Sequence, residues 1–191
     1  DGADSQPVSG LLIASAFIEG TTNITVHNPG EKPWIDLTLA WFDTLGIPYS
    51  HTEYTHYTVQ GGHTIQGFTY KVPGDFSSIA YPLVAALITQ SAITIHGIDM
   101  TDTQGDKQLI QVLKNMGANI VTQNNTLVVK PSETIKGYDI DVNGFIDALP
   151  ILAVLGCYAQ GTTTLSNAGI ARQKECDRLA AITLELNKMG G

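Results

Sequence analysis

The sequence predicts an α/β (α+β) fold built from repeated units of helix, strand, helix, strand and strand. A single pattern recurs about every seventy residues along the 191-residue chain. Short β-branched stretches alternate in it with apolar runs long enough for buried helices. A glycine follows the second helix of each unit, where a left-handed cap can end a helix. We therefore expect helices to bury one face of each sheet.

The first helix of each repeat is predicted from an apolar run that follows an aspartate. The three runs are Leu11–Phe17, Leu83–Ile88 and Ile151–Tyr158. Asp4, Asp75 and Asp147 precede them at matching places. An aspartate at this position can accept hydrogen bonds from the free N–H groups of the first helical turn.

A short strand and a second helix follow in each repeat. The predicted strands lie within residues 20–26, 90–95 and 161–165, which are rich in β-branched side chains. We expect the second helices to begin near Asp36, Asp106 and Asp177, where acidic residues suit the helix dipole. They are expected to end at Leu45-Gly46, Met116-Gly117 and Met189-Gly190.

Two paired strands complete the unit in the first two repeats. In the second repeat, residues 118–121 and 126–129 flank a turn at Asn124-Asn125. The third repeat stops at Gly190-Gly191, before any such pair. We therefore expect the third unit to be truncated.

The best candidate linker lies between the first and second repeats. Gly61-Gly62, Gly67 and Pro73-Gly74 supply its turn-forming residues. We place a domain boundary near Tyr70–Pro73, which predicts one domain over residues 1–70 and another over residues 71–191.

Composition excludes several classes of partner. With 10 Lys+Arg against 18 Asp+Glu, the formal net charge of −8 repels nucleic acid. The two cysteines, Cys157 and Cys176, form neither a disulfide framework nor a zinc pattern, and suit a reducing cytosol. No apolar stretch reaches the length of a membrane-spanning helix. We predict a cytoplasmic protein without a nucleic-acid or membrane partner.

Two helix starts contain candidate functional residues. Ser5 and Gln6 either cap a helix or bind an anion, because a helix N-terminus offers aimed N–H donors and both side chains add neutral ones. Asp147 either caps a helix, as its counterparts suggest, or acts as a general base on a substrate hydroxyl.

The densest group of charges is residues 172–178, Arg-Gln-Lys-Glu-Cys-Asp-Arg. Such a run is commonly a solvated first helical turn with local ion pairs. Cations at a helix start oppose the dipole, however, which indicates another use for Lys174 and Arg178. Arginine suits carboxylate or phosphate binding, and Glu175 can donate or accept a proton.

Three segments of the chain resemble sequence motifs of one enzyme family. Residues 174–179, Lys-Glu-Cys-Asp-Arg-Leu, are similar to a Lys-Glu-Ser/Thr-Asp-Arg-Leu signature. Residues 73–78, Pro-Gly-Asp-Phe-Ser-Ser, resemble a Gly-Asp-x-Ser-Ser segment, and residues 32–38 a Lys-Pro-Tyr-Ile-Asp-Ile-Thr segment. All three motifs belong to the 5-enolpyruvylshikimate-3-phosphate synthase family of enolpyruvyl transferases, which the whole chain resembles.

The resemblance implies an inside-out α/β barrel of six βαβαββ units, of which this chain holds about three, the last truncated. Residues 1–70 are then the end of the first enolpyruvyl transferase domain, and residues 71–191 the start of the second. It implies transfer of the carboxyvinyl group of phosphoenolpyruvate to the 5-hydroxyl of shikimate 3-phosphate, without a metal or organic cofactor. Ser5, Gln6 and Lys174 then contact shikimate 3-phosphate. Asp147 is the base, Glu175 assists proton transfer and Arg178 holds the phosphoenolpyruvate carboxylate.

Four positions depart from the family pattern. Asp4 and Glu31 stand where the family has serines, Trp34 replaces a tyrosine and Ile170 an asparagine. Two carboxylates beside a phosphate repel it. A divergent transferase with another hydroxylated acceptor and a non-catalytic binding module therefore stay open as alternatives. Because the family's outer cationic ligands lie in segments absent from this chain, we expect the chain alone to be inactive and to need the remainder of a parent protein.

Overall fold

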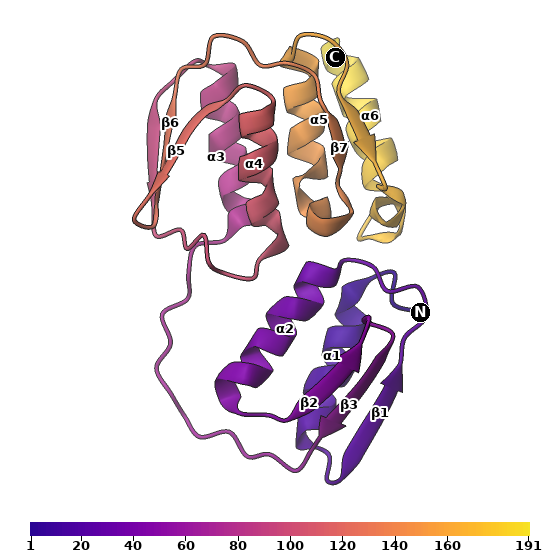
Figure 1. Cartoon of the computed structure of the whole chain (residues 1–191). Coiled ribbons are helices and arrows are strands. Elements are labelled where there is room, and N and C mark those ends of the chain that lie inside the picture. The colour runs from indigo at the N-terminus through magenta and orange to yellow at the C-terminus, as the bar shows by residue number, and fades with distance from the viewer. The chain divides into compact units, whose positions relative to one another are not determined.

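The computed structural model describes residues 1–191 and divides them into two compact units. Unit 1 comprises residues 1–71 and unit 2 comprises residues 72–191 (Figure 1). Each unit has its own cluster of buried apolar side chains, so each can be described by itself. No helix is both long and apolar enough to cross a membrane.

Unit 1 is one complete repeat. Its elements are α1 (Ser5–Phe17), β1 (Thr21–Thr25), α2 (Lys32–Leu45), β2 (Tyr49–Thr52) and β3 (His56–Gln60). The three strands form an antiparallel sheet in the order β1-β3-β2, with Asn23 opposite Thr58. The predicted sequence of helix, strand, helix, strand and strand is confirmed.

The first half of unit 2 repeats this arrangement. Its elements are α3 (Phe76–Ile88), β4 (Ile93–His96), the 3-10 turn η1 (Gly105–Lys107), α4 (Gln108–Asn115), β5 (Asn119–Gln123) and β6 (Thr126–Lys130). The strand order β4-β6-β5 is again antiparallel and matches that of unit 1. Asn124 and Asn125 both have positive φ, as the predicted hairpin turn requires. The shared topology confirms the repeat.

The second half of unit 2 is the third repeat, without its paired strands. It contains β7 (Asp139–Asp141), η2 (Asn143–Ala148), α5 (Leu149–Tyr158), β8 (Thr164–Ser166), η3 (Gly169–Gln173) and α6 (Arg178–Met189). Strands β7 and β8 pair in parallel, with Ile140 opposite Leu165. The sequence analysis did not identify β7.

Helix ends follow the chemistry that the sequence indicated. Gly46, Gly117 and Gly190 have φ of 69°, 103° and 86°, in the left-handed region that lets the chain leave each second helix. The start predicted for α2 near Asp36 was wrong by one turn. Helix α2 begins at Lys32, because Pro33 fits its first turn, where no backbone donor is needed.

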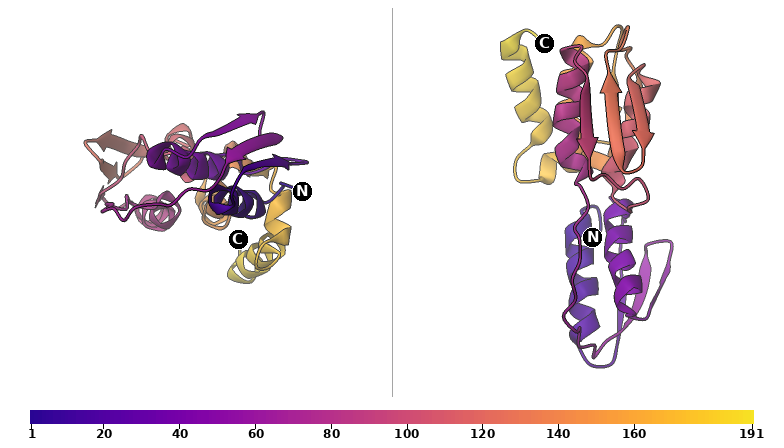
Figure 2. Two further views of the ribbon diagram at one scale, coloured as in Figure 1. Left: turned by 90° about the horizontal axis from the view of Figure 1, so that it is seen from below. Right: turned by 90° about the vertical axis from the view of Figure 1, so that its left-hand side faces the viewer.

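Each unit buries side chains from its helices and its strands in one apolar core. In unit 1, Leu12 of α1 and Val59 of β3 are fully buried. In unit 2, Leu83, Leu113 and Leu152 place α3, α4 and α5 in one core. Helix α6 packs on α5 and has no fully buried residue, and it lies away from the strands (Figure 2). This leaves the α6 face toward α3 partly open.

A buried tyrosine in unit 1 gives a test of stability. The Tyr57 hydroxyl is buried and has no hydrogen-bond partner, and burial raises the pKa of Tyr57 to about 12. Because the pKa of Tyr57 is higher in the folded chain than in the unfolded chain, deprotonation of Tyr57 favours unfolding. The stability that the protonated hydroxyl contributes is therefore complete below pH 10 and is lost as the pH rises to about 12. We expect Tyr57→Phe to raise the free energy of unfolding by about 1 kcal/mol at pH 7 and to weaken alkaline unfolding.

Tyr54→Phe is the matched control, because the Tyr54 hydroxyl donates to Asp36 at 2.7 Å and its loss should destabilise. Urea unfolding of both variants at pH 7 and pH 11 measures the difference. Equal destabilisation by the two substitutions would contradict the prediction.

Candidate active site

Unit 2 contains a cavity of about 520 Å³ at the N-terminal ends of α3, α5 and α6. Its walls come from Ser77, Ser78 and Tyr81 of α3, Asp147 of η2, Pro150 of α5, Glu175 and Cys176 of the preceding loop, and Arg178, Ala181, Ile182 and Glu185 of α6. This volume suits a small organic ligand. Three of the residues predicted from the sequence, Asp147, Glu175 and Arg178, therefore line one cavity.

Arg178 is the centre of the charged wall of this cavity. Its Nε and Nη2 atoms donate to the two carboxylate oxygens of Glu175, both at 2.9 Å. Its Nη1 atom donates to Oδ1 of Asp147 at 2.7 Å. The guanidinium is mostly buried, with 19% of the side chain exposed, whereas the Glu175 side chain is 66% exposed. One cation thus holds two carboxylates that differ in exposure, because the Asp147 side chain is 40% exposed.

The contacts shift the ionisation of both partners. Hydrogen bonds from Arg178 lower the pKa of Glu175 below its ordinary value. The Glu175 and Asp147 carboxylates in turn raise the pKa of Arg178, although its burial opposes this. At neutral pH Arg178 is therefore a cation and Glu175 a carboxylate anion.

Local structure fixes Asp147 and Arg178. Asp147 lies in η2 between the buried side chains of Ile146 and Ala148, and it accepts no capping hydrogen bond, since Ala148 precedes α5. Asp4 and Asp75, by contrast, cap α1 and α3. The capping interpretation of Asp147 is therefore replaced by its ion pair with Arg178.

Asp177 is the residue that begins α6 and so orients Arg178. Its carboxylate accepts from the Ala180 amide at 3.0 Å and from Nη1 of Arg172 at 2.8 Å. The capping hydrogen bond and the Arg172 contact lower the pKa of Asp177. Arg178 is consequently the first helical residue.

Lys174 belongs to the same loop but does not line the cavity. It follows η3 in an extended conformation and is partly buried. Its charge contributes to the lowered pKa of Glu175, after the larger effect of Arg178. The structure therefore brings Lys174 near the cluster without placing it at the cavity wall.

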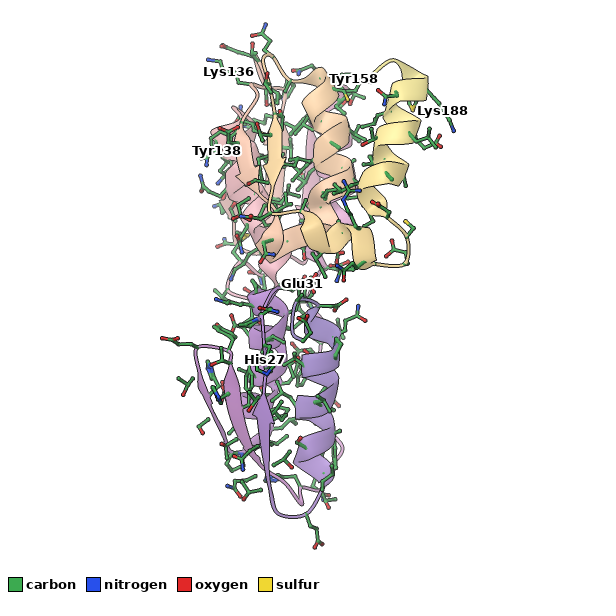
Figure 3. All side chains as sticks on the ribbon, turned by 90° about the vertical axis from the view of Figure 1, so that its right-hand side faces the viewer. His27, Glu31, Lys136, Tyr138, Tyr158 and Lys188 are labelled. Atoms are coloured by element: carbon green, nitrogen blue, oxygen red, sulfur yellow. The ribbon has the colours of Figure 1, made fainter.

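Ser5 and Gln6 lie at the start of α1 in unit 1. The Ser5 amide and hydroxyl donate to Oε2 of Glu31 at 2.9 and 3.1 Å. The Gln6 amide donates to Asp4 at 2.9 Å, and Gln6 is exposed. Glu31 precedes α2 and is labelled in Figure 3. In this structure a carboxylate of the chain occupies the donors of Ser5.

Glu31 itself is held in an unusual conformation. Its φ of 44° is left-handed, and only 1% of the residue is exposed. A non-glycine residue in this region is uncommon and costs free energy. Its contacts to Ser5 join the N-terminal ends of α1 and α2, which gives a structural reason for the strain.

We expect Glu31→Ala to lower the free energy of unfolding of unit 1 by about 1–3 kcal/mol, because the buried Ser5 donors lose their acceptor. Glu31→Gln keeps an acceptor oxygen and the same backbone, and is expected to cost less. Thermal unfolding of the two variants beside the unmodified chain measures this. An alanine variant as stable as the unmodified chain would show that the contact contributes nothing.

The structure adds wall residues that the sequence analysis did not single out for the site. Tyr81 lies about one turn after Ser77 and Ser78 and faces the same cavity. Burial alone would raise the pKa of Asp75, but hydrogen bonds from the hydroxyls and backbone amides of Ser77 and Ser78 together lower it. Helical spacing from the Asp-x-Ser-Ser segment is the signal that could have identified Tyr81.

Comparisons with known proteins agree with this architecture. The family model for EPSP synthase (3-phosphoshikimate 1-carboxyvinyltransferase) matches residues 3–191. The 3-phosphoshikimate 1-carboxyvinyltransferase of Chlamydia abortus is 50% identical over 191 residues, which are 99% of this chain and 42% of that protein. That of Ruminiclostridium cellulolyticum is 38% identical, covering 100% of this chain and 45% of the relative.

Solved structures show the same fold. An EPSP synthase from Acinetobacter baumannii superposes with a TM-score of 0.75 at 28% identity, over 98% of this chain and 43% of that one. The enolpyruvyl transferase NikO from Streptomyces tendae gives a TM-score of 0.64 at 18% identity, over 81% and 37%, which supports the fold alone. The predicted fold class is confirmed, and the chain spans less than half the length of these relatives. With a family model matching nearly every residue, the chain belongs to the EPSP synthase (3-phosphoshikimate 1-carboxyvinyltransferase) family.

Proposed function

We propose that this chain forms part of a transferase of the shikimate pathway, which moves the carboxyvinyl group of phosphoenolpyruvate to the 5-hydroxyl of shikimate 3-phosphate. The observation that carries the proposal is the convergence of Asp147, Glu175 and Arg178 on one cavity. A base, a second carboxylate and a carboxylate-binding arginine are the groups that this reaction needs within reach of one ligand.

The proposed reaction proceeds in two balanced steps. The hydroxyl oxygen bonds to C2 of phosphoenolpyruvate while the hydroxyl proton goes to a base and C3 gains a proton. The bond from C2 to the phosphate oxygen then breaks, C3 returns a proton, and phosphate leaves an enol ether. Fixed charges that stabilise the intermediate supply much of the rate enhancement in such a mechanism.

Each predicted residue has a role in this proposal. Arg178 binds the phosphoenolpyruvate carboxylate through paired N–H donors, the geometry for which arginine is suited. Asp147 is the base near the 5-hydroxyl, and Glu175 exchanges the proton at C3. Lys174, Ser5 and Gln6 contact shikimate 3-phosphate.

The neighbourhood of Ser5 favours a second candidate acceptor. Its amide and hydroxyl already donate to Glu31, so an acceptor phosphate at this place must displace a carboxylate. An acceptor with a hydroxyl or amine at the corresponding position avoids that charge repulsion. A transferase for a different hydroxylated acid is therefore the alternative proposal.

A chimera tests both candidates. Residues 1–191 replace the matching segment of the Chlamydia abortus relative, and phosphate release from phosphoenolpyruvate is measured with shikimate 3-phosphate and with shikimate. We expect turnover that depends on shikimate 3-phosphate. A folded chimera that turns over shikimate faster would favour the alternative acceptor, and one that is inactive with every acceptor would count against the transferase.

The remainder of a longer chain is a proposed partner of these two units. The curated relatives are more than twice as long as this chain, and their additional segments are expected to complete the substrate contacts. We place the activity in the cytoplasm, where the exposed free thiols of Cys157 and Cys176 would stay reduced.

A further inference from the structure

The contacts of Arg178 with Glu175 and Asp147 oppose the proton exchange proposed for Glu175. A carboxyl group must hold a proton before it can donate one. Glu175 is ion-paired through both of its oxygens, and Arg178 keeps its pKa below the ordinary value. While this contact lasts, Glu175 stays ionised at neutral pH and cannot supply a proton.

The same contact also limits anion binding. The Nε and Nη2 atoms form the edge of the guanidinium that grips a carboxylate with two parallel hydrogen bonds, and Glu175 occupies that edge. Asp147 takes Nη1 with a single contact. A ligand that binds through paired donors therefore competes with Glu175 for this edge of Arg178, whose charge two carboxylates already share.

We propose that Glu175 occupies Arg178 only until an anionic ligand arrives, so that the carboxylate of the ligand takes the Nε–Nη2 edge and releases Glu175 to exchange a proton. The choice of phosphoenolpyruvate as that ligand rests on the function proposed above. Glu175 is the partner that can leave, because its side chain is 66% exposed whereas that of Asp147 is 40% exposed. Glu175 and Arg178 both line the cavity of about 520 Å³, so the released carboxylate and the ligand would share one space.

Release changes the ionisation of Glu175 in a defined direction. Loss of the Arg178 hydrogen bonds removes the largest cause of its lowered pKa, and a nearby ligand anion disfavours a second negative charge. The pKa of Glu175 therefore rises on binding. The other titratable or charged side chains facing it are Lys174 and Cys176 of its own loop, Asp147 of η2, Tyr81 of α3, and Arg178 and Glu185 of α6.

Glu185 provides a matched control in the same cavity. It is a glutamate of α6 at the cavity wall, but it pairs with Lys188 at 2.7 Å and forms no ion pair with Arg178. Glu175→Gln and Glu185→Gln thus remove the same charge from the same cavity. Only the first removes a competitor for Arg178.

Calorimetric titration of the 191-residue chain with phosphoenolpyruvate, and separately with inorganic phosphate, tests the proposal. A competitor that occupies the binding edge most of the time reduces the apparent affinity in proportion to the fraction of molecules in which that edge is free. We expect Glu175→Gln to tighten phosphoenolpyruvate binding about fivefold or more, and Glu185→Gln to change it less than twofold. A Glu175→Ala variant should repeat the gain.

Carboxyl NMR of the unmodified chain gives the second readout. The Glu175 signal, identified by its loss in Glu175→Gln, is expected to titrate at higher pH with phosphoenolpyruvate than without it. Unchanged or weaker binding by both Glu175 variants, an equal gain in Glu185→Gln, no binding by any form, or an unmoved titration would each overturn the displacement. Equal binding of phosphate and phosphoenolpyruvate with a gain confined to the Glu175 variants would support displacement and count against the proposed substrate.

Discussion

Replacing Arg178 with alanine in the chimera is expected to lower kcat/KM for phosphoenolpyruvate by roughly a hundredfold or more. Two effects act together. The ligand carboxylate loses its paired donors, and Asp147 and Glu175 lose the cation that holds both of them. Arg178→Lys keeps the charge but cannot offer donors in the same fork, so we expect an intermediate loss.

Lys188→Ala is the control for removing a cation from α6. Lys188 is exposed and forms an ion pair only with Glu185, and surface pairs of this kind contribute little. Steady-state kinetics of the three variants, with thermal unfolding to confirm that each is folded, separate catalysis from stability. A kcat/KM of Arg178→Ala within threefold of that of the unmodified chimera would show that Arg178 does not act in the site.

Much of the fold could be predicted because its signals are local. A left-handed glycine such as Gly46 or Gly117 ends a helix wherever it occurs, and Asn124-Asn125 forms its turn from its own backbone preferences. Because the units repeat, a helix or strand recognised in one unit predicted its counterpart in the next. Strand β7 was not predicted because its three residues, Asp139–Asp141, alternate between exposed and buried over too short a stretch to be recognised. Its partner is also distant in the sequence, since Asp139 pairs with Thr164 of β8.

The sequence indicated three of the residues that line the cavity, but not the contacts between them. The segment containing Glu175 and Arg178 is a specific signature, and the repeat placed Asp147 at a helix start, where its counterparts indicated a cap. The sequence could not indicate that Arg178 holds both carboxylates, since this depends on how η2 and α6 approach each other. The contact of Glu31 with Ser5 spans 26 positions and needs a left-handed backbone at Glu31, which no local pattern predicts for a glutamate.

These contacts change how the departures from the family pattern are understood. Glu31 stands where a serine is expected, yet it is a buried acceptor that joins two helices of unit 1. Under the proposed function, we therefore expect a substitution of Glu31 to change both the stability of unit 1 and the choice of acceptor. The Glu31→Ala and Glu31→Gln variants, transferred to the chimera, separate the two effects because both remove the charge and only one retains the acceptor oxygen.

The isolated 191-residue chain is expected to release no measurable phosphate from phosphoenolpyruvate, even with excess shikimate 3-phosphate. The chain covers 42% of the Chlamydia abortus relative, and the family resemblance places further cationic substrate ligands in the other segments. Each missing group that positions a substrate or stabilises charge can lower the rate by about a hundredfold. Several such losses multiply, because the transition state needs all of these groups at once.

Anion binding is expected to survive this loss of turnover. Arg178 is held by Asp147 and Glu175, which both belong to unit 2, so its pocket does not depend on the missing segments. A phosphate-release assay on the purified chain, beside the chimera and the full-length relative, measures the first expectation, and calorimetry measures the second. Turnover by the chain approaching that of the relative would show that the groups of these two units suffice, and would place the catalytic ligands entirely within residues 1–191.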